Sequence, residues 1–254
     1  ADELRVIIEN ILFGHAFLTI MNRCNQYGLN FSSLLSKKVD ELCACDPRRI
    51  TFTLLCGLNV VDFPNKKKKI EASLLTRREC TLFDPVSNLY FMRDPAFVIG
   101  KSLVLGRMYW PVRWREPAII RNIVKYHPFM KNIHSVDWDL DSGEFFFAEG
   151  GDVMAIGDGD YAIAESERTN RQAISKIAGQ LLKEDGVNRI FQPIIPARRA
   201  FIHLDTVCSL AGTDGVVVHV DAMEAYADTL CWSQDNTFDG EFIPKSLGKN
   251  FIKV

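Results

Sequence analysis

The chain has 254 residues, of which 47% are hydrophobic, so it can bury the core of one large domain or two small ones. A formal net charge of −2 and a pI of about 6.3 give no indication that nucleic acid or an anionic membrane is the main partner. No uninterrupted apolar run approaches the length of a membrane span, and the first residues lack the features of a signal peptide.

The seven cysteines are an odd number and lie mostly in apolar surroundings, which favours free thiols in a reducing, cytoplasmic compartment. Cys43 and Cys45 lack a second ligand pair at the spacing of a zinc site, so we interpret them as helix thiols. Because the sequence does not begin with methionine, we expect a fragment, a processed chain or a chain given without its ends.

Residues 3 to 58 are predicted to form a small bundle of helices. Apolar residues at helical spacing indicate the first helix, and these are Ile7, Ile8, Ile11, Leu12, Ala16, Phe17 and Ile20. Ser32 or Ser33 is predicted to cap the second. Asp46 and Pro47 are predicted to open the third, which should end before Gly57, since Asp is a good N-cap and Pro suits the first helical position.

Residues 59 to 80 interrupt this pattern and contain four consecutive lysines, Lys66–Lys69. We interpret them as a solvated loop rather than a patch for an anionic partner, because no aromatic or amphipathic pattern accompanies them.

From Asn88 onward, strands are predicted to alternate with helices. A strand–strand–helix–strand unit is indicated, with a helix that begins at Thr169 or Asn170. The predicted strands of this region are Phe145–Ala148, Val153–Ile156, Tyr161–Ala164 and Arg189–Ile195. The segments 201–210 and 215–220 are predicted to begin another such unit.

His203 and Asp205 stand two residues apart on a segment that is predicted to be extended, so they should point to the same face. The histidine can serve as a general acid and base near neutral pH, and Asp205 can bind a cation beside it or orient the ring. A core histidine that is satisfied by a neighbour is the alternative interpretation.

Glu149 follows an apolar run and precedes two glycines, which let backbone approach a ligand closely. A carboxylate at the end of a buried strand needs a partner or a function, although a surface bend is an equally good interpretation. Asp94 precedes Pro95 and is either a turn former or a cation-binding acid. With Asp152 and Asp205, these residues make four acids beside one histidine, a set that suits a small cationic substrate.

Five segments follow one another in a particular order. They are DPVSNLYFMRDP at 84–95, VRWRE at 112–116, EGGD at 149–152, SERTN at 166–170 and HLDT at 203–206. In this order and at these spacings they resemble the arginine deiminase family of the guanidino-group-modifying superfamily, over most of residues 30 to 210. The sequence departs from the family at Met92, where Thr is usual, and at Cys208, where an aromatic or other apolar residue is usual.

The resemblance implies an α/β fold, namely a five-bladed α/β propeller of ββαβ units, incomplete here, with a small helical bundle inserted after the first blade. We therefore expect residues 1–75 to form the bundle and residues 76–254 a partial catalytic domain. It also implies that the N-terminal blade and the C-terminal part with the nucleophilic Cys are missing from this sequence. We interpret Cys208 as a core residue rather than as that nucleophile.

By position in the motifs, the resemblance implies that Asp94 and Asp205 grip a guanidinium group with charge-assisted hydrogen bonds. It implies that Glu149 and His203 are the acid–base pair.

The resemblance assigns four further positions to substrate binding. Arg113 and Arg168 would hold the α-carboxylate of the substrate, a task that suits the planar fork of arginine. Asn88 would contact the amino-acid end, and Phe91 would pack on the substrate stem.

The resemblance implies hydrolysis of L-arginine to L-citrulline and ammonia through a covalent Cys-amidino intermediate, with no metal or organic cofactor. It implies a cytoplasmic homo-oligomer whose partner is a small molecule, not nucleic acid or a membrane. The alternatives are another superfamily enzyme, an amidinotransferase or a dimethylarginine hydrolase, and an inactive paralogue that binds guanidino compounds.

Overall fold

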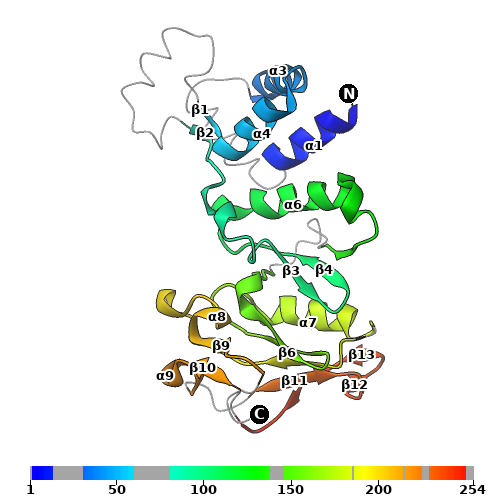
Figure 1. Ribbon diagram of the computed structural model, residues 1–254, viewed down its shortest axis with the longest axis vertical. Helices are drawn as coiled ribbons and strands as arrows, with labels where there is room; N and C mark the ends of the chain where they lie inside the picture. Colours follow the sequence, from blue (N-terminus) through cyan, green and yellow to red (C-terminus); the bar gives the residue numbers. More distant parts are fainter. Residues whose placement is uncertain are drawn as a thin grey trace. The chain divides into compact units, whose positions relative to one another are not determined.

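The structure is a computed structural model that describes residues 2–13, 31–59, 81–137, 146–184, 186–213, 215–224 and 229–249 (Figure 1). Helices and strands are mixed along the chain, which confirms the predicted α/β class. Two compact units form, Ala1–Tyr90 with Trp110–Asn122, and Phe91–Tyr109 with Ile123–Val254. The predicted domain boundary after residue 75, the lysine run, Cys24 and Cys80 lie outside the described residues.

The first unit contains α1 (Asp2–Phe13), α3 (Phe31–Cys43) and α4 (Pro47–Cys56), and these helices contact one another as the bundle prediction requires. Their buried apolar residues are Ile8, Ile11, Val39, Leu42, Ile50 and Leu54. The unit also contains the antiparallel pair β1 (Leu58–Asn59) and β2 (Thr81–Phe83), the short helices η2 (Ser87–Tyr90) and η3 (Pro111–Arg113), and the start of α6 (Arg115–Tyr126).

The predicted start and end of α4 are confirmed. The Asp46 carboxylate accepts hydrogen bonds from the N–H groups of Arg48 (3.0 Å) and Arg49 (3.2 Å), and Pro47 occupies the first turn. Gly57 follows the helix with a φ of 80°, which glycine adopts without strain. The predicted caps Ser32 and Ser33 are wrong, because α3 already begins at Phe31.

Two strand–strand–helix–strand motifs follow one another in the chain, and the helix of the first motif, α6, belongs mainly to the first compact unit. In the first, β3 (Ala96–Ile99) pairs antiparallel with β4 (Ser102–Leu105), which pairs parallel with β5 (His134–Val136) after α6. In the second, β6 (Val153–Gly157) pairs antiparallel with β7 (Asp160–Ile163), and β8 (Arg189–Gln192) follows α7 (Arg171–Leu181) and pairs parallel with β7. This second ββαβ motif confirms the strand–strand–helix–strand unit that the sequence predicts, including Asn170 as the N-cap of α7.

The sheet of this second ββαβ unit has the order β14-β11-β8-β7-β6, with β11 (Leu230–Ser233) and β14 (Lys245–Ser246) added antiparallel. Its two faces carry different apolar clusters, because neighbouring strand residues point to opposite sides. Val153 and Ile163 pack with α7 on one face, whereas Met154 and Ala162 pack with the other cluster. That cluster includes residues of α8 (Leu204–Val207) and α9 (Val220–Met223).

The remaining short elements of this unit are η4 (Pro128–Met130), η5 (Gly150–Asp152), η6 (Arg199–Phe201), and the hairpins β9 (Cys208–Leu210) with β10 (Val216–Val218) and β12 (Thr237–Phe238) with β13 (Glu241–Phe242). None of the helices in the described ranges is long and apolar enough to cross a membrane.

Three strand predictions need correction. In the described part of the segment 145–148, only Ala148 makes a β-bridge, with Arg107, because this segment runs as a loop into η5. The strand predicted over 189–195 ends at Gln192, before Pro193, which cannot donate to the ladder.

The segment that begins at Phe201 is not an extended strand, because a helical turn interrupts it after His203. Thr206 Oγ1 accepts a hydrogen bond from His203 N–H (3.4 Å) and donates one to the His203 carbonyl oxygen (2.6 Å). These local bonds satisfy the backbone at the start of α8, so the strand begins only at Cys208.

Candidate active site

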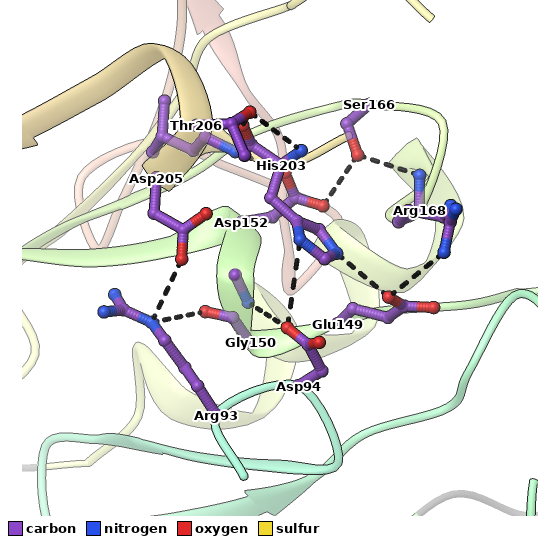
Figure 2. Close-up of polar contacts among 12 residues, drawn as sticks. Arg93, Asp94, Glu149, Gly150, Asp152, Ser166, Arg168, His203, Asp205 and Thr206 are labelled. Atoms are coloured by element: carbon purple, nitrogen blue, oxygen red, sulfur yellow. Dashed lines mark hydrogen bonds and ion pairs between the residues drawn. The ribbon is translucent and has the colours of Figure 1, made fainter. Parts of the chain in front are cut away.

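Several loops of the second unit meet around the imidazole of His203, which is the N-cap residue of α8 (Figure 2). Glu149 directly precedes η5, and Asp94 lies shortly before β3. Arg168 lies in the loop between β7 and α7. The site is thus built from strand ends and loops that the sheet and α7 hold in place.

The two glycines of η5 allow the close approach of these loops. A Cβ on Gly150 would lie 2.0 Å from the Arg93 carbonyl oxygen, and a Cβ on Gly151 would lie 2.5 Å from His203 Nδ1. The sequence predicted that these glycines admit a ligand. In the structure they lie against the Arg93 backbone and the His203 ring, and their approach to a ligand stays a prediction.

Glu149 and His203, the predicted acid–base pair, are in direct contact. His203 Nε2 lies 2.9 Å from Glu149 Oε2, while Glu149 Oε1 accepts a hydrogen bond from the Tyr109 N–H (3.0 Å). Glu149 is fully buried and His203 is 6% exposed, so bulk water does not screen the pair. The carboxylate therefore fixes the ring and favours its protonated form.

Two opposing effects set the pKa of His203. Burial alone would lower it, but the hydrogen bond that the ring donates to Glu149 and the negative charges nearby raise it above the ordinary value of an imidazole. These charges belong to Asp152, Asp94 and Glu149. The ring is therefore a proton donor over a wider pH range than a free histidine.

Asp94 and Asp205, the predicted guanidinium-binding acids, both lie near the His203 ring. The buried Asp94 places Oδ1 3.9 Å from His203 Nδ1, and the same oxygen accepts a hydrogen bond from the Gly151 N–H (3.2 Å). Asp205 is more exposed, and its Oδ2 lies 3.9 Å from Arg93 Nε. Partial burial raises the pKa of Asp205 and the nearby Asp94 adds to this, whereas His203 and Arg93 oppose it.

Arg168 reaches the same pair from the loop after β7. Its Nη1 lies 3.7 Å from Glu149 Oε2, and its Nε lies 3.6 Å from Glu167 Oε1. Its side chain is 13% exposed, so a guanidinium group of the protein stands at the edge of the acid–base pair.

Phe91, in the second unit, is 58% exposed. Asn88 and Arg113 belong to the first unit, and Arg113 is buried with its guanidinium bonded to both oxygens of Glu116, at 3.0 and 2.8 Å. Their roles at a substrate stay predictions.

Ligand atoms of Asp94, Glu149 and His203 lie within 4.8 Å of one another, so by residue type this cluster could hold a metal ion. However, the imidazole and Glu149 are hydrogen-bonded to each other, and Asp94 accepts from Gly151. We therefore interpret the cluster as an acid–base site and a cation-binding site rather than a metal centre.

Cys208 packs in the apolar cluster beneath α8, as the sequence prediction of a core residue requires. Burial raises the pKa of Cys208, and also that of Cys231, where nearby charges partly offset one another. A raised pKa disfavours the thiolate, which is the nucleophilic form of cysteine.

Sequence reasoning gave no role to Arg93 and Ser166, and it placed Asp152 only among the acids of a cationic site, although all three lie within the motifs. Arg93 Nε donates to the Gly150 carbonyl oxygen (3.0 Å), and the Ser166 hydroxyl donates to Asp152 Oδ2 (2.6 Å). Their place in the motifs was the only available signal, since their partners are distant in sequence.

The arginine deiminase family model matches residues 36–248 of this chain. The arginine deiminase of Listeria monocytogenes serotype 4b is 34% identical over 181 residues, which cover 71% of this chain and 44% of that protein. Arginine deiminase 1 of Staphylococcus epidermidis is 37% identical over 175 residues, covering 67% and 40%. Among solved structures, the N-terminal domain of ArgZ, covalently bound to a reaction intermediate, is 19% identical with a TM-score of 0.43, covering 62% of this chain and 54% of that one.

An α/β scaffold that buries a carboxylate–imidazole pair between further carboxylates suits a protein that acts on a cationic substrate. The extent of the family match goes further, and the chain belongs to the arginine deiminase family. It spans less than half the length of these curated relatives.

Proposed function

We propose that this chain supplies the acid–base and guanidinium-binding groups of an arginine deiminase, which converts L-arginine and water to L-citrulline and ammonia. The observation that carries the proposal is the buried contact between Glu149 and His203, with Asp94 beside the ring. A carboxylate-rich pocket around a proton donor is what a guanidinium substrate with an amine leaving group requires.

In the proposed complex, Asp94 and Asp205 accept hydrogen bonds from the substrate guanidinium. Arg93 then keeps Asp205 ionised in the free site, and the substrate competes with Arg93 for its oxygens. Two charge-assisted acceptors would fix the plane of the guanidinium, so that its central carbon is presented to a nucleophile.

The chemistry uses a cysteine thiolate of the whole protein, as the family resemblance implies. The thiolate adds to the guanidinium carbon, and the carbon–nitrogen bond breaks as His203 gives its proton to the departing ammonia. Now neutral, His203 takes a proton from water, whose oxygen attacks the amidino carbon. The carbon–sulfur bond then breaks as the added hydroxyl group gives its proton to ammonia or solvent, which returns the thiolate and releases neutral citrulline.

Substrate recognition beyond the guanidinium is proposed from the motifs. Arg113 and Arg168 would hold the α-carboxylate, Asn88 the amino-acid end, and Phe91 the aliphatic stem. Because Arg168 already lies beside Glu149, we propose that it contacts the carboxylate of the substrate and steadies Glu149 at the same time.

The two ββαβ units support, as a further proposal, a five-bladed α/β propeller for the whole protein. We propose a homo-oligomer in the cytoplasm that needs no metal or organic cofactor.

The test separates binding from turnover. Isothermal titration should show that the 254-residue chain binds L-arginine and prefers it to the neutral L-citrulline. We expect no release of citrulline by this chain, because buried thiols such as Cys208 are poor nucleophiles, whereas the full-length protein should turn over at about 1–1000 per second. Turnover of dimethylarginine, or amidino transfer to an amine, would assign one of the alternative enzymes. A lack of saturable arginine binding would refute the proposal.

A further inference from the structure

Asp152 is a fully buried acid that joins the segments of the site. Its Oδ1 accepts a hydrogen bond from the Leu204 N–H (2.9 Å), and its Oδ2 accepts one from the Ser166 hydroxyl (2.6 Å). Figure 2 shows its carboxyl group between the turn that carries His203 and the loop that carries Arg168. One carboxyl group therefore ties the start of α8 to the loop before α7.

The Ser166 hydroxyl links Asp152 to the backbone around Arg168 through hydrogen bonds. Its oxygen accepts hydrogen bonds from the N–H groups of Arg168 (2.9 Å) and Thr169 (3.1 Å). With both acceptor positions used, its own hydrogen goes to Asp152. The Thr169 hydroxyl in turn accepts from the Glu149 N–H (3.1 Å). This network uses both oxygens of Asp152 as acceptors, which is the bonding pattern of the ionised acid.

The charges of Asp152 and His203 are coupled. Burial raises the pKa of Asp152 to about 7, although the charge of His203 and hydrogen bonds from its neighbours lower it. In the other direction, the negative charge of Asp152 helps to raise the pKa of His203. The other acids that face this pair are Asp94, Glu149 and Asp205. The charge of each group therefore shifts the pKa of the other.

We propose that Asp152 is a positioning residue, whose carboxylate fixes the His203 turn against the Arg168 loop and keeps the imidazole protonated. The contribution of Asp152 to catalysis rests on the proposed function, in which protonated His203 donates a proton to the departing ammonia. In this role Asp152 acts through His203 and Ser166.

Three substitutions separate the charge of Asp152 from its tether. Asp152→Asn removes the charge at nearly constant size, whereas Ser166→Ala keeps the charge and removes the hydroxyl bridge. Asp160→Asn is the matched control. Asp160 is a buried aspartate like Asp152, but it lies in β7 and forms an ion pair with Arg189. The readouts are the titration of the His203 ring, followed by NMR in the 254-residue chain, and the Kd for L-arginine.

In Asp152→Asn we expect His203 to titrate at lower pH than in the wild type, and L-arginine to bind about tenfold more weakly, the loss of one charged hydrogen bond. Ser166→Ala should weaken arginine binding and leave the His203 titration near that of the wild type. Asp160→Asn should lower the thermal stability and leave both readouts unchanged. A folded Asp152→Asn chain with the wild-type His203 titration would overturn the proposal.

If Asp152→Asn does not fold, the proposal is tested by titrating Asp152 and His203 in the wild-type chain. The carboxyl carbon of Asp152 and the ring of His203 should then show coupled titration curves, and two independent single-site curves would contradict the proposal. Coupled curves in a chain that binds no arginine would count against the proposed function and leave the positioning role supported.

Discussion

Replacement of Glu149 by glutamine should destabilise the chain by an amount that depends on pH. Glu149 is fully buried and His203 nearly so, and loss of one partner from a buried ion pair costs about 3–5 kcal/mol. Glutamine keeps the size and one acceptor oxygen, so we expect the low end, about 3 kcal/mol, while His203 is protonated. Above the folded-state pKa of His203, the loss is reduced to ordinary hydrogen bonding, about 1 kcal/mol.

The direction in which this stability loss changes with pH follows from the raised pKa of His203. The pKa of His203 is raised on folding, so the ion pair contributes fully below the unfolded pKa of about 6.5 and is lost as the pH rises through the folded pKa. Glu149→Gln removes the main partner of this shift. The stability difference between wild type and variant should therefore be largest below about pH 6.5 and decline as the pH rises through the raised pKa of His203.

The assay is urea unfolding, followed by circular dichroism at several pH values. Glu167→Gln is the control, since Glu167 Oε1 lies 3.6 Å from Arg168 Nε but the Glu167 side chain is 23% exposed. It should cost less than about 1 kcal/mol and show no such decline. A Glu149→Gln difference that is constant with pH, or grows toward alkaline pH, would refute the coupling of this pair.

Two further outcomes are expected. Asp94→Asn and Asp205→Asn should each weaken L-arginine binding by about thirtyfold or more in isothermal titration, because an unpaired cation in the site costs about 2–5 kcal/mol; near-wild-type affinity would make the residue a turn former. Gly151→Ala should displace the His203 ring, which a Cβ would meet at 2.5 Å, and abolish measurable binding, whereas Gly179→Ala in α7, with no atom within 4 Å, should raise stability by about 0.5–1 kcal/mol. Equal behaviour of the two glycine variants in thermal unfolding and binding would contradict the packing at η5.

Local signals were sufficient where the deciding contacts lie within a few residues. The opening of α4 depends on Asp46 and Pro47, and that of α7 on Asn170, so the sequence alone located both helix starts. The turn after His203 was missed because Thr206 bonds the backbone of His203 twice, and this local bonding outweighs the apolar pattern that favours a strand.

In the candidate site, too, the sequence indicated the residues of local motifs but not the contacts between residues that are distant in the chain. The motifs identified Glu149, His203 and Asp94, which the structure brings together. The role of Asp152 could not be derived, because its partners Ser166 and Leu204 approach it only when β6, β7 and α8 pack. A buried acid with long-range partners leaves no periodic pattern in a sequence.

The charge of the site bears on which ligand it prefers. Four carboxylic acids gather around one imidazole in the described part of the site, and these are Asp94, Glu149, Asp152 and Asp205. Ion pairs with Asp205 and Glu149 bring Arg93 and Arg168 to this group. With His203 protonated and these four acids ionised, their negative charges exceed the positive charges of His203, Arg93 and Arg168 by one, and Glu167 beside Arg168 adds a further negative charge. A guanidinium substrate would balance this excess, whereas the neutral ureido group of citrulline would not, so the same electrostatics that favour binding of arginine also favour release of its proposed product.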